Sequence, residues 1–98
     1  MYIVKTHPNF DAWLEGIKDR VARLRLSRRL DKAQQGNLGD IKPVGEGIFE
    51  MREHFGPGWR MYDVQREQIL VVMLGGGDKS TQTTDIARAV TLAATLED

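Results

Sequence analysis

Apolar residues recur at helical spacing through the first third of the chain, after a short β-prone run at residues 2–5. The apolar positions change phase near Lys18 and therefore fall into two rows. The first row is Leu14, Ile17, Val21 and Leu24, and the second is Ala22, Leu26, Leu30 and Ala33. This shift indicates either two helices packed as a hairpin or one helix buried on two sides. We favour a short helix at about residues 9–17 and a longer one at about 19–35.

The rest of the chain has the patterns of strands and one further helix. Residues 47–66 alternate around the turn Phe55-Gly56-Pro57-Gly58, which predicts a β-hairpin. Residues 68–74 are almost wholly apolar, so we expect a strand hidden on both faces at the centre of the sheet. Residues 40–44 are extended at best, because Pro43 excludes a central strand. A last helix, ending at about residue 96, has an apolar face formed by Ile86, Ala89, Val90, Ala93 and Leu96.

The predicted elements follow the order β-α-α-β-β-β-α, which indicates an α+β fold. We expect a mainly antiparallel sheet of three or four strands with helices packed on it. The 98 residues form one domain, spanning 1–98, without room for a separate cofactor domain.

The composition, with 41% hydrophobic and 29% charged residues, fits a soluble globular protein rather than a disordered one. No run of about 18 apolar residues occurs, and the N-terminal residues lack the layout of a signal peptide, so we expect no membrane association. Zero cysteines exclude disulfides and thiolate metal sites. His7 and His54 are far apart, and neither has a second ligand at metal spacing. We therefore expect no metal and no other cofactor.

Half of the basic residues lie in one short segment, although the formal net charge is zero. Residues 18–32 hold seven of the fourteen, which are Lys18, Arg20, Arg23, Arg25, Arg28, Arg29 and Lys32. On the longer predicted helix, one face carries a basic stripe of Lys18, Arg25, Arg29 and Lys32. Such a stripe favours RNA or an acidic protein as the partner, and a solvated helix face explains it equally well.

The predicted hairpin concentrates functional side chains. Glu50, Arg52 and His54 are two residues apart, so a strand places them on one face, and Arg60 on the return strand comes near Arg52. Two guanidiniums and an imidazole on one exposed sheet face predict a phosphate site. The alternative is a solvated face with a cross-strand ion pair to Glu50.

A glycine-rich segment, residues 75–82 (GGGDKSTQ), lies between the apolar strand and the last helix. Backbone N–H groups in such a loop can converge on an anion, and Lys79 adds positive charge. The segment is not a Walker loop, because Asp78 and Met73 stand where that motif needs glycines. The alternative is a glycine turn capped by Asp78.

Several stretches together resemble one protein family. They are PNFDAWLEGIKDR, GNLGDIKPVGEGIFEMR, HFGPGWRMY and LGGGDKSTQTTDIARA, which lie within about residues 8–92. In this order and at these separations they resemble the HigB-like "addiction module killer protein" branch of the RelE/ParE superfamily. Members are toxins of type II toxin–antitoxin modules in bacteria and phages.

The resemblance implies two N-terminal helices on a twisted antiparallel sheet, and a cognate antitoxin that is often a small helix-turn-helix protein. RelE-like toxins cleave messenger RNA in the ribosomal A site, whereas ParE-like toxins poison DNA gyrase and cleave no RNA. We expect a cytoplasmic, metal-independent, ribosome-dependent endoribonuclease that inhibits growth and acts on the ribosome and its mRNA. The alternatives are a gyrase poison and a degenerate, non-toxic member that only binds its antitoxin.

The family motifs assign candidate residues. Arg60 falls on the arginine of the G-Y-R motif, with Trp59 in place of the usual tyrosine. Arg52 matches the arginine of the E-L-R triplet, with Met51 in place of leucine, and Lys79 matches the lysine of the G-G-D-K loop. The strand before this arginine lacks the lysines of RelE itself, so a lysine general base is not transferred.

Metal-free RNA cleavage needs a base for the 2′-hydroxyl, a cation for the charge on phosphorus and an acid for the 5′-oxygen. We expect Arg52 and Arg60 to bind the scissile phosphate, with Lys79 as a further cation. His54 or Glu50 is the candidate base, and the ordinary pKa of histidine, about 6.5, suits this role. The catalytic candidates are therefore Arg52, His54, Arg60 and Lys79. The candidates for binding RNA or the ribosome are Lys18, Arg25, Arg28, Arg29 and Lys32.

Overall fold

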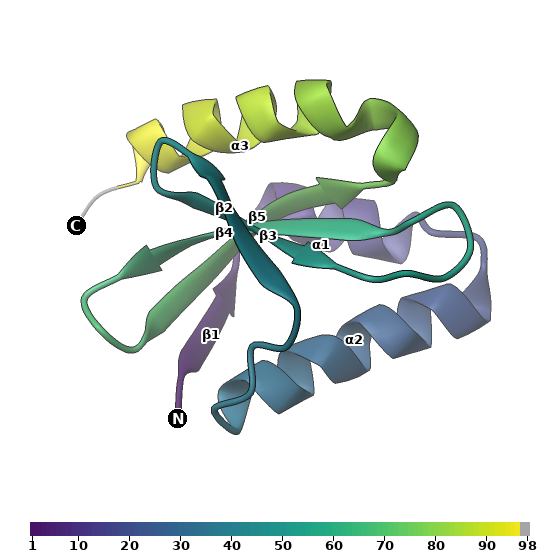
Figure 1. Ribbon diagram of the computed structural model, residues 1–98, viewed down its shortest axis with the longest axis horizontal. Coiled ribbons are helices and arrows are strands. Elements are labelled where there is room, and N and C mark those ends of the chain that lie inside the picture. The colour runs from purple at the N-terminus through teal and green to yellow at the C-terminus, as the bar shows by residue number, and fades with distance from the viewer. Residues whose placement is uncertain (97–98) are drawn as a thin grey trace.

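The computed structural model describes residues 1–96, which form three α-helices and five strands in an α+β arrangement (Figure 1). The strands are β1 (Ile3–Thr6), β2 (Ile41–Gly45), β3 (Ile48–Arg52), β4 (Arg60–Arg66) and β5 (Leu70–Gly77). The helices are α1 (Pro8–Glu15), α2 (Arg20–Gln34) and α3 (Gln82–Thr95), and a 3₁₀ turn, η1 (Lys79–Thr81), precedes α3. The α+β class and the pair of N-terminal helices are confirmed. Within this part of the chain, no helix is long and apolar enough to cross a membrane.

The five strands of residues 1–96 form one sheet in the order β1-β5-β4-β3-β2. β1 runs parallel to β5 and the other neighbouring pairs are antiparallel, so the sheet is mainly antiparallel, as predicted. The predicted number of strands is too low, because residues 41–45 pair with β3 at the edge. An edge strand pairs on one side only and therefore tolerates Pro43. The apolar segment at 68–74 supplies β5, an interior strand beside the central β4.

Helix α2 buries only the second of the two predicted apolar rows. Its buried members are Ala22, Leu26, Leu30 and Ala33. Val21 and Leu24, from the first row, are 64% and 53% exposed. The helix begins after Asp19, whose Oδ1 accepts hydrogen bonds from two backbone N–H groups at 3.0 and 3.1 Å. Lys18 precedes this cap, so it lies in the connection between α1 and α2 rather than on the predicted helix.

Helices cover both faces of the sheet, with α3 on one face and α1 and α2 on the other (Figure 1). Alternate strand residues point to opposite faces. Met51 therefore joins the core under α1 and α2, whereas Ile48 joins the core under α3. Glu50 and Arg52 lie two and four residues after Ile48 and share its face. The polar end of β3 is thus directed toward α3.

Candidate functional site

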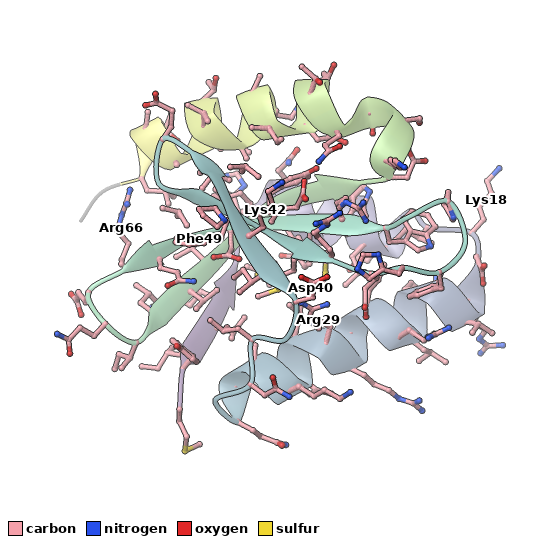
Figure 2. All side chains as sticks on the ribbon, viewed as in Figure 1. Lys18, Arg29, Asp40, Lys42, Phe49 and Arg66 are labelled. Carbon is pink, nitrogen blue, oxygen red and sulfur yellow. The ribbon has the colours of Figure 1, made fainter. Side chains whose placement is uncertain are left out.

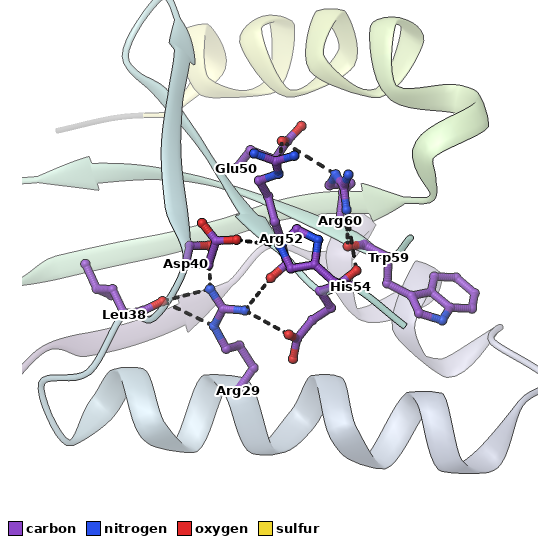
Figure 3. Close-up of polar contacts among 9 residues, drawn as sticks. Arg29, Leu38, Asp40, Glu50, Arg52, His54, Trp59 and Arg60 are labelled. Carbon is purple, nitrogen blue, oxygen red and sulfur yellow. Dashed lines mark hydrogen bonds and ion pairs between the residues drawn. The ribbon is translucent and has the colours of Figure 1, made fainter. Parts of the chain in front are cut away.

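The end of the β3–β4 hairpin holds the two arginines that the sequence singles out. Arg52 and Arg60 lie opposite each other, and their Nε atoms are 3.7 and 3.6 Å from Glu50 Oε1 (Figure 3). Glu50 is 1% and Arg60 4% exposed, and Arg60 Nη1 also donates to the Trp59 carbonyl at 3.1 Å. The ion pair to Glu50 exists, but the prediction of an exposed sheet face is wrong for these two residues. The buried, paired Glu50 carboxylate is also poorly placed to act as the base.

The start of α3 closes over this carboxylate. Gln82 Nε2 donates to Glu50 Oε2 at 2.7 Å. Tyr62 is fully buried on the same face of β4, and burial, followed by the Glu50 charge, raises the pKa of its phenol. Asp85, which accepts a hydrogen bond from Thr81 Oγ1 at 2.5 Å, acts on Tyr62 in the same direction. Sequence reasoning missed Tyr62 and Gln82, because only the packing of α3 on the sheet brings them to Glu50.

The glycines of residues 75–77 continue β5 and pair with β4, so the predicted anion-binding glycine loop is wrong. Their small size serves packing. A Cβ added at Gly76 would lie 2.5 Å from the Trp13 ring, and one added at Gly77 would overlap the Asp85 side chain. Glycine here lets α1 and α3 approach the sheet closely.

Lys79 lies beside the hairpin turn. Asp78 is a cap, as the alternative interpretation predicted, but it caps η1 rather than a glycine turn, by accepting a hydrogen bond from the Ser80 N–H at 2.8 Å. The Lys79 side chain is exposed. A Cβ built on Gly58 would lie 3.3 Å from Lys79 Cβ and 3.7 Å from Arg60 Nη1. Lys79 therefore stands at the surface above the buried Arg60 guanidinium.

His54 follows the end of β3 and pairs with a residue that the sequence did not indicate. Its Nε2 is 2.7 Å from Asp40 Oδ2, and the two side chains are 65% and 51% exposed. The hydrogen bond with His54 lowers the pKa of Asp40 below its ordinary range. The Arg52 N–H donates to the Asp40 carbonyl at 3.0 Å, which fixes the backbone beneath the pair. An exposed imidazole oriented by a carboxylate is suited to general acid–base chemistry.

Arg29 is not part of an exposed basic stripe, because it is only 7% exposed. Its guanidinium donates to the carbonyls of Leu38, Asp40 and Arg52, with shortest distances of 2.9, 2.7 and 2.8 Å (Figure 3). It also lies 3.3 Å from Glu53 Oε2. These contacts occupy the guanidinium, so Arg29 joins α2 to the sheet and is a poor candidate for contact with RNA.

The other candidates for binding RNA or the ribosome are exposed. Arg28 and Lys32 lie on α2, and Lys18 lies before its N-terminal end, away from Arg29 (Figure 2). The Arg25 guanidinium lies 3.9 Å from the centre of the Phe55 ring, at a cation–π distance. Arg25 thereby connects the basic face of α2 to the turn of the hairpin.

The structure thus brings together Arg52, Arg60, Lys79 and the His54–Asp40 pair at one end of the sheet. Only Arg52, Lys79 and His54 offer exposed surface among the predicted catalytic residues, since Arg60 is buried behind them. Such a set can bind a phosphate and exchange a proton with a neighbouring hydroxyl. In the described residues 1–96, no group of three or more His, Asp or Glu side chains could hold a metal ion.

Comparison with known proteins gives one relative. The chain is 45% identical over 93 residues to a protein of Haemophilus influenzae (strain ATCC 51907 / DSM 11121 / KW20 / Rd), which is named only "Uncharacterized protein". The match covers 95% of this chain and 94% of the relative. No protein-family model matches the chain. No solved structure matches it either.

Proposed function

We propose that this chain, which belongs to one family with the uncharacterized Haemophilus influenzae protein, is the toxin of a type II toxin–antitoxin module and cleaves messenger RNA on the ribosome. The observation that carries the proposal is the convergence of Arg52, Lys79 and the His54–Asp40 pair at one end of the sheet. The ribosome and its mRNA are the targets, so we assign the protein to the cytoplasm.

The arrangement of elements supports membership of the RelE/ParE superfamily, in its HigB-like branch. Two N-terminal helices pack on one face of a mainly antiparallel sheet, and a C-terminal helix packs on the other. The pair of N-terminal helices on a mainly antiparallel sheet is the part of this arrangement that the sequence resemblance implies. The fold supports both RNA cleavage and gyrase poisoning, so the choice between them depends on the site.

The residues of the site divide the roles of metal-free RNA cleavage. His54, oriented by Asp40, takes the proton of the 2′-hydroxyl, the 2′-oxygen bonds to phosphorus as the bond from phosphorus to the 5′-oxygen breaks, and the leaving 5′-oxygen takes a proton from water. Arg52 and Lys79 bind the scissile phosphate and stabilise its developing negative charge. Arg60 lies behind them, where it shares Glu50 with Arg52. We expect slow cleavage of isolated RNA, because the ribosome supplies the orientation of the strand.

A DNA gyrase poison is the second candidate, and the buried Glu50 favours it. This carboxylate lies within 3.7 Å of both arginine Nε atoms and so reduces the positive charge available to a phosphate. A toxin that acts only by binding a protein needs no free phosphate site. In either case the partner is a cognate antitoxin, which we propose to be a helix-turn-helix protein.

The deciding experiment is expression without antitoxin, followed by primer extension on an abundant message during growth arrest. New 5′ ends within translated codons, absent when translation is blocked, support the nuclease. Arrest with intact messages and broken DNA supports the gyrase poison, and no arrest supports a non-toxic, antitoxin-binding member.

Substitutions at the site refine this experiment. His54→Ala should lower cleavage by about 10²–10⁴-fold, the usual contribution of acid–base catalysis. Lys79→Ala should also lower cleavage, and Lys5→Ala, on β1, is the control that should leave it unchanged. Full cleavage by both His54→Ala and Lys79→Ala would show that the site is wrong.

A further inference from the structure

A pocket of about 230 Å³ opens beside the His54–Asp40 pair, between the end of α2, the segment at residues 37–40 and the end of β3. Its lining brings Lys32 of α2 together with Arg52 and His54 of the hairpin. These residues belong to two basic groups that are separate in the sequence, the α2 stripe and the hairpin site. The structure therefore joins the two groups at one small cavity.

One buried side chain holds the walls of this pocket in place. Arg29 donates to the Asp40 carbonyl at 2.7 Å, to the Arg52 carbonyl at 2.8 Å and to the Leu38 carbonyl at 2.9 Å. It thereby ties α2, the 37–40 segment and β3 to a single planar guanidinium. A pocket fixed in this way loses little conformational entropy when it binds a ligand.

The charge of the pocket is positive at its exposed rim. Its two carboxylates are engaged, Asp40 by His54 at 2.7 Å and Glu53 by Arg29 at 3.3 Å. Lys32 is exposed and makes no ion pair within residues 1–96. Arg52 has a one-third exposed side chain. An anion that enters the pocket therefore meets Lys32, which has no ion-pair partner in the described residues, and Arg52, whose charge Glu50 partly offsets from 3.7 Å.

We propose that this pocket is a subsite for a backbone phosphate of an RNA strand, adjacent to the bond that the proposed nuclease cuts. Lys32 binds the phosphate oxygens of this subsite, and Arg52 and His54, which the proposed function places at the scissile phosphate, lie in the same lining. A cavity of about 230 Å³ is smaller than most sites for whole cofactors, and it suits a phosphate with its ribose. The assignment of RNA as the strand rests on the proposed function.

The test is binding of a trinucleotide of 2′-O-methyluridine, which has no free 2′-hydroxyl and so is not cleaved, followed by backbone-amide NMR. Titration of the wild-type protein should move the signals of Asn37, Gly39 and His54 in a saturable way. Lys32→Ala should weaken binding about tenfold, the size of one lost charge-assisted hydrogen bond. Lys5→Ala removes the same charge outside the pocket and should leave the affinity unchanged.

Two results would overturn the subsite. One is equal affinity of Lys32→Ala and Lys5→Ala for the trinucleotide, and the other is signal changes confined to η1 and α3. Because this assay needs no ribosome and no cleavage, it separates the two proposals. Binding in the pocket without message cleavage in cells would retain the phosphate subsite and reject the nuclease, whereas cleavage with normal trinucleotide binding by Lys32→Ala would reject the subsite alone.

Discussion

At the scale of single residues, the least expected feature is Asp63, an acidic side chain fully buried in the central strand β4. Burial raises the pKa of this carboxyl to about 7, although Gln65 and the Arg29 charge act in the opposite direction. Glu50 is buried to a similar extent on the other face of the sheet, but two arginine Nε atoms lie within 3.7 Å of its carboxylate. The two acidic side chains therefore differ in whether cations lie beside them.

Asp63 should make the stability of the protein depend on pH. The carboxyl has a pKa of 3.8 in the unfolded chain and about 7 in the fold, so folded molecules hold the proton to higher pH. The free energy of unfolding should therefore fall as the pH rises from about 4 to 7, and level off above that. Asp63→Asn should remove this fall and gain roughly 2–4 kcal/mol at pH 8 over the wild type.

Urea titrations of both proteins at pH 5 and pH 8 measure the difference. Asp31→Asn, on the exposed face of α2, changes the same charge without burial and is the control. An identical pH dependence for Asp63→Asn and the wild type would contradict the expectation.

Arg29 should be a large contributor to stability. Arg29→Met leaves the carbonyls of Leu38, Asp40 and Arg52 without their donor and Glu53 without its ion pair. We expect a loss of about 3–5 kcal/mol in the free energy of unfolding, because three carbonyls lose a charged donor and each unsatisfied buried group costs about 1–3 kcal/mol. Arg29→Lys should recover little, because an ammonium cannot reproduce the planar fork.

Chemical denaturation of Arg29→Met, with Arg28→Met as the exposed neighbour, tests this role. A loss equal to that of Arg28→Met would show that the network around Arg29 adds nothing.

At the scale of elements, the helical period was enough to find α1 and α2, but not to say which apolar row of α2 faces the sheet. Both rows have the same spacing, and the choice depends on how α2 is rotated when it meets the strands. β2 was missed because Pro43 disfavours a strand, and only its pairing with β3 shows that it is an edge. The glycines of residues 75–77 predict a loop in the sequence, because the side chains that require small residues there come from distant helices.

The rotation of α2 gives a matched pair of substitutions. Leu26→Ala removes a fully buried side chain and should cost about 2–5 kcal/mol, whereas Leu24→Ala, two residues earlier and 53% exposed, should cost under about 1 kcal/mol. Thermal or urea unfolding of the two variants measures the difference. Equal costs would mean that α2 is rotated differently from the arrangement described above.

At the scale of the whole molecule, the position of the candidate site was predictable and its construction was not. The hairpin of residues 47–66 and Lys79 do meet at one end of the sheet. The sequence does not indicate Asp40 and Tyr62 as members of the site, because their contacts depend on how β2 pairs with β3 and on how α3 packs on the sheet. Arg29 was assigned to the surface because a periodic basic stripe does not reveal which member turns inward.

The exposed basic residues predict how association with ribosomes should respond to salt. If Lys18 and Arg28 contact ribosomal RNA, Lys18→Ala or Arg28→Ala should weaken binding. Each should also reduce the steepness of log affinity against log salt by about one, which is the contribution of one phosphate contact. Arg88→Ala on α3 should leave that slope unchanged. Sedimentation with ribosomes at a series of salt concentrations gives these slopes, and equal slopes for all three variants would exclude Lys18 and Arg28 as contacts with ribosomal RNA.

The pairing of β1 with β5 has a consequence for how a cell makes this protein. Ile3 pairs with Leu70, so β1 stays unpaired during synthesis until the residues of β5 have been made. The hairpin with Arg52 and Arg60 emerges before β5 borders it and before α3 closes over Glu50. At synthesis rates of about 5–20 residues per second, β1 therefore stays without its partner for several seconds. The end of the sheet that holds Arg52, His54 and Lys79 is completed only after residues well beyond the hairpin have been made.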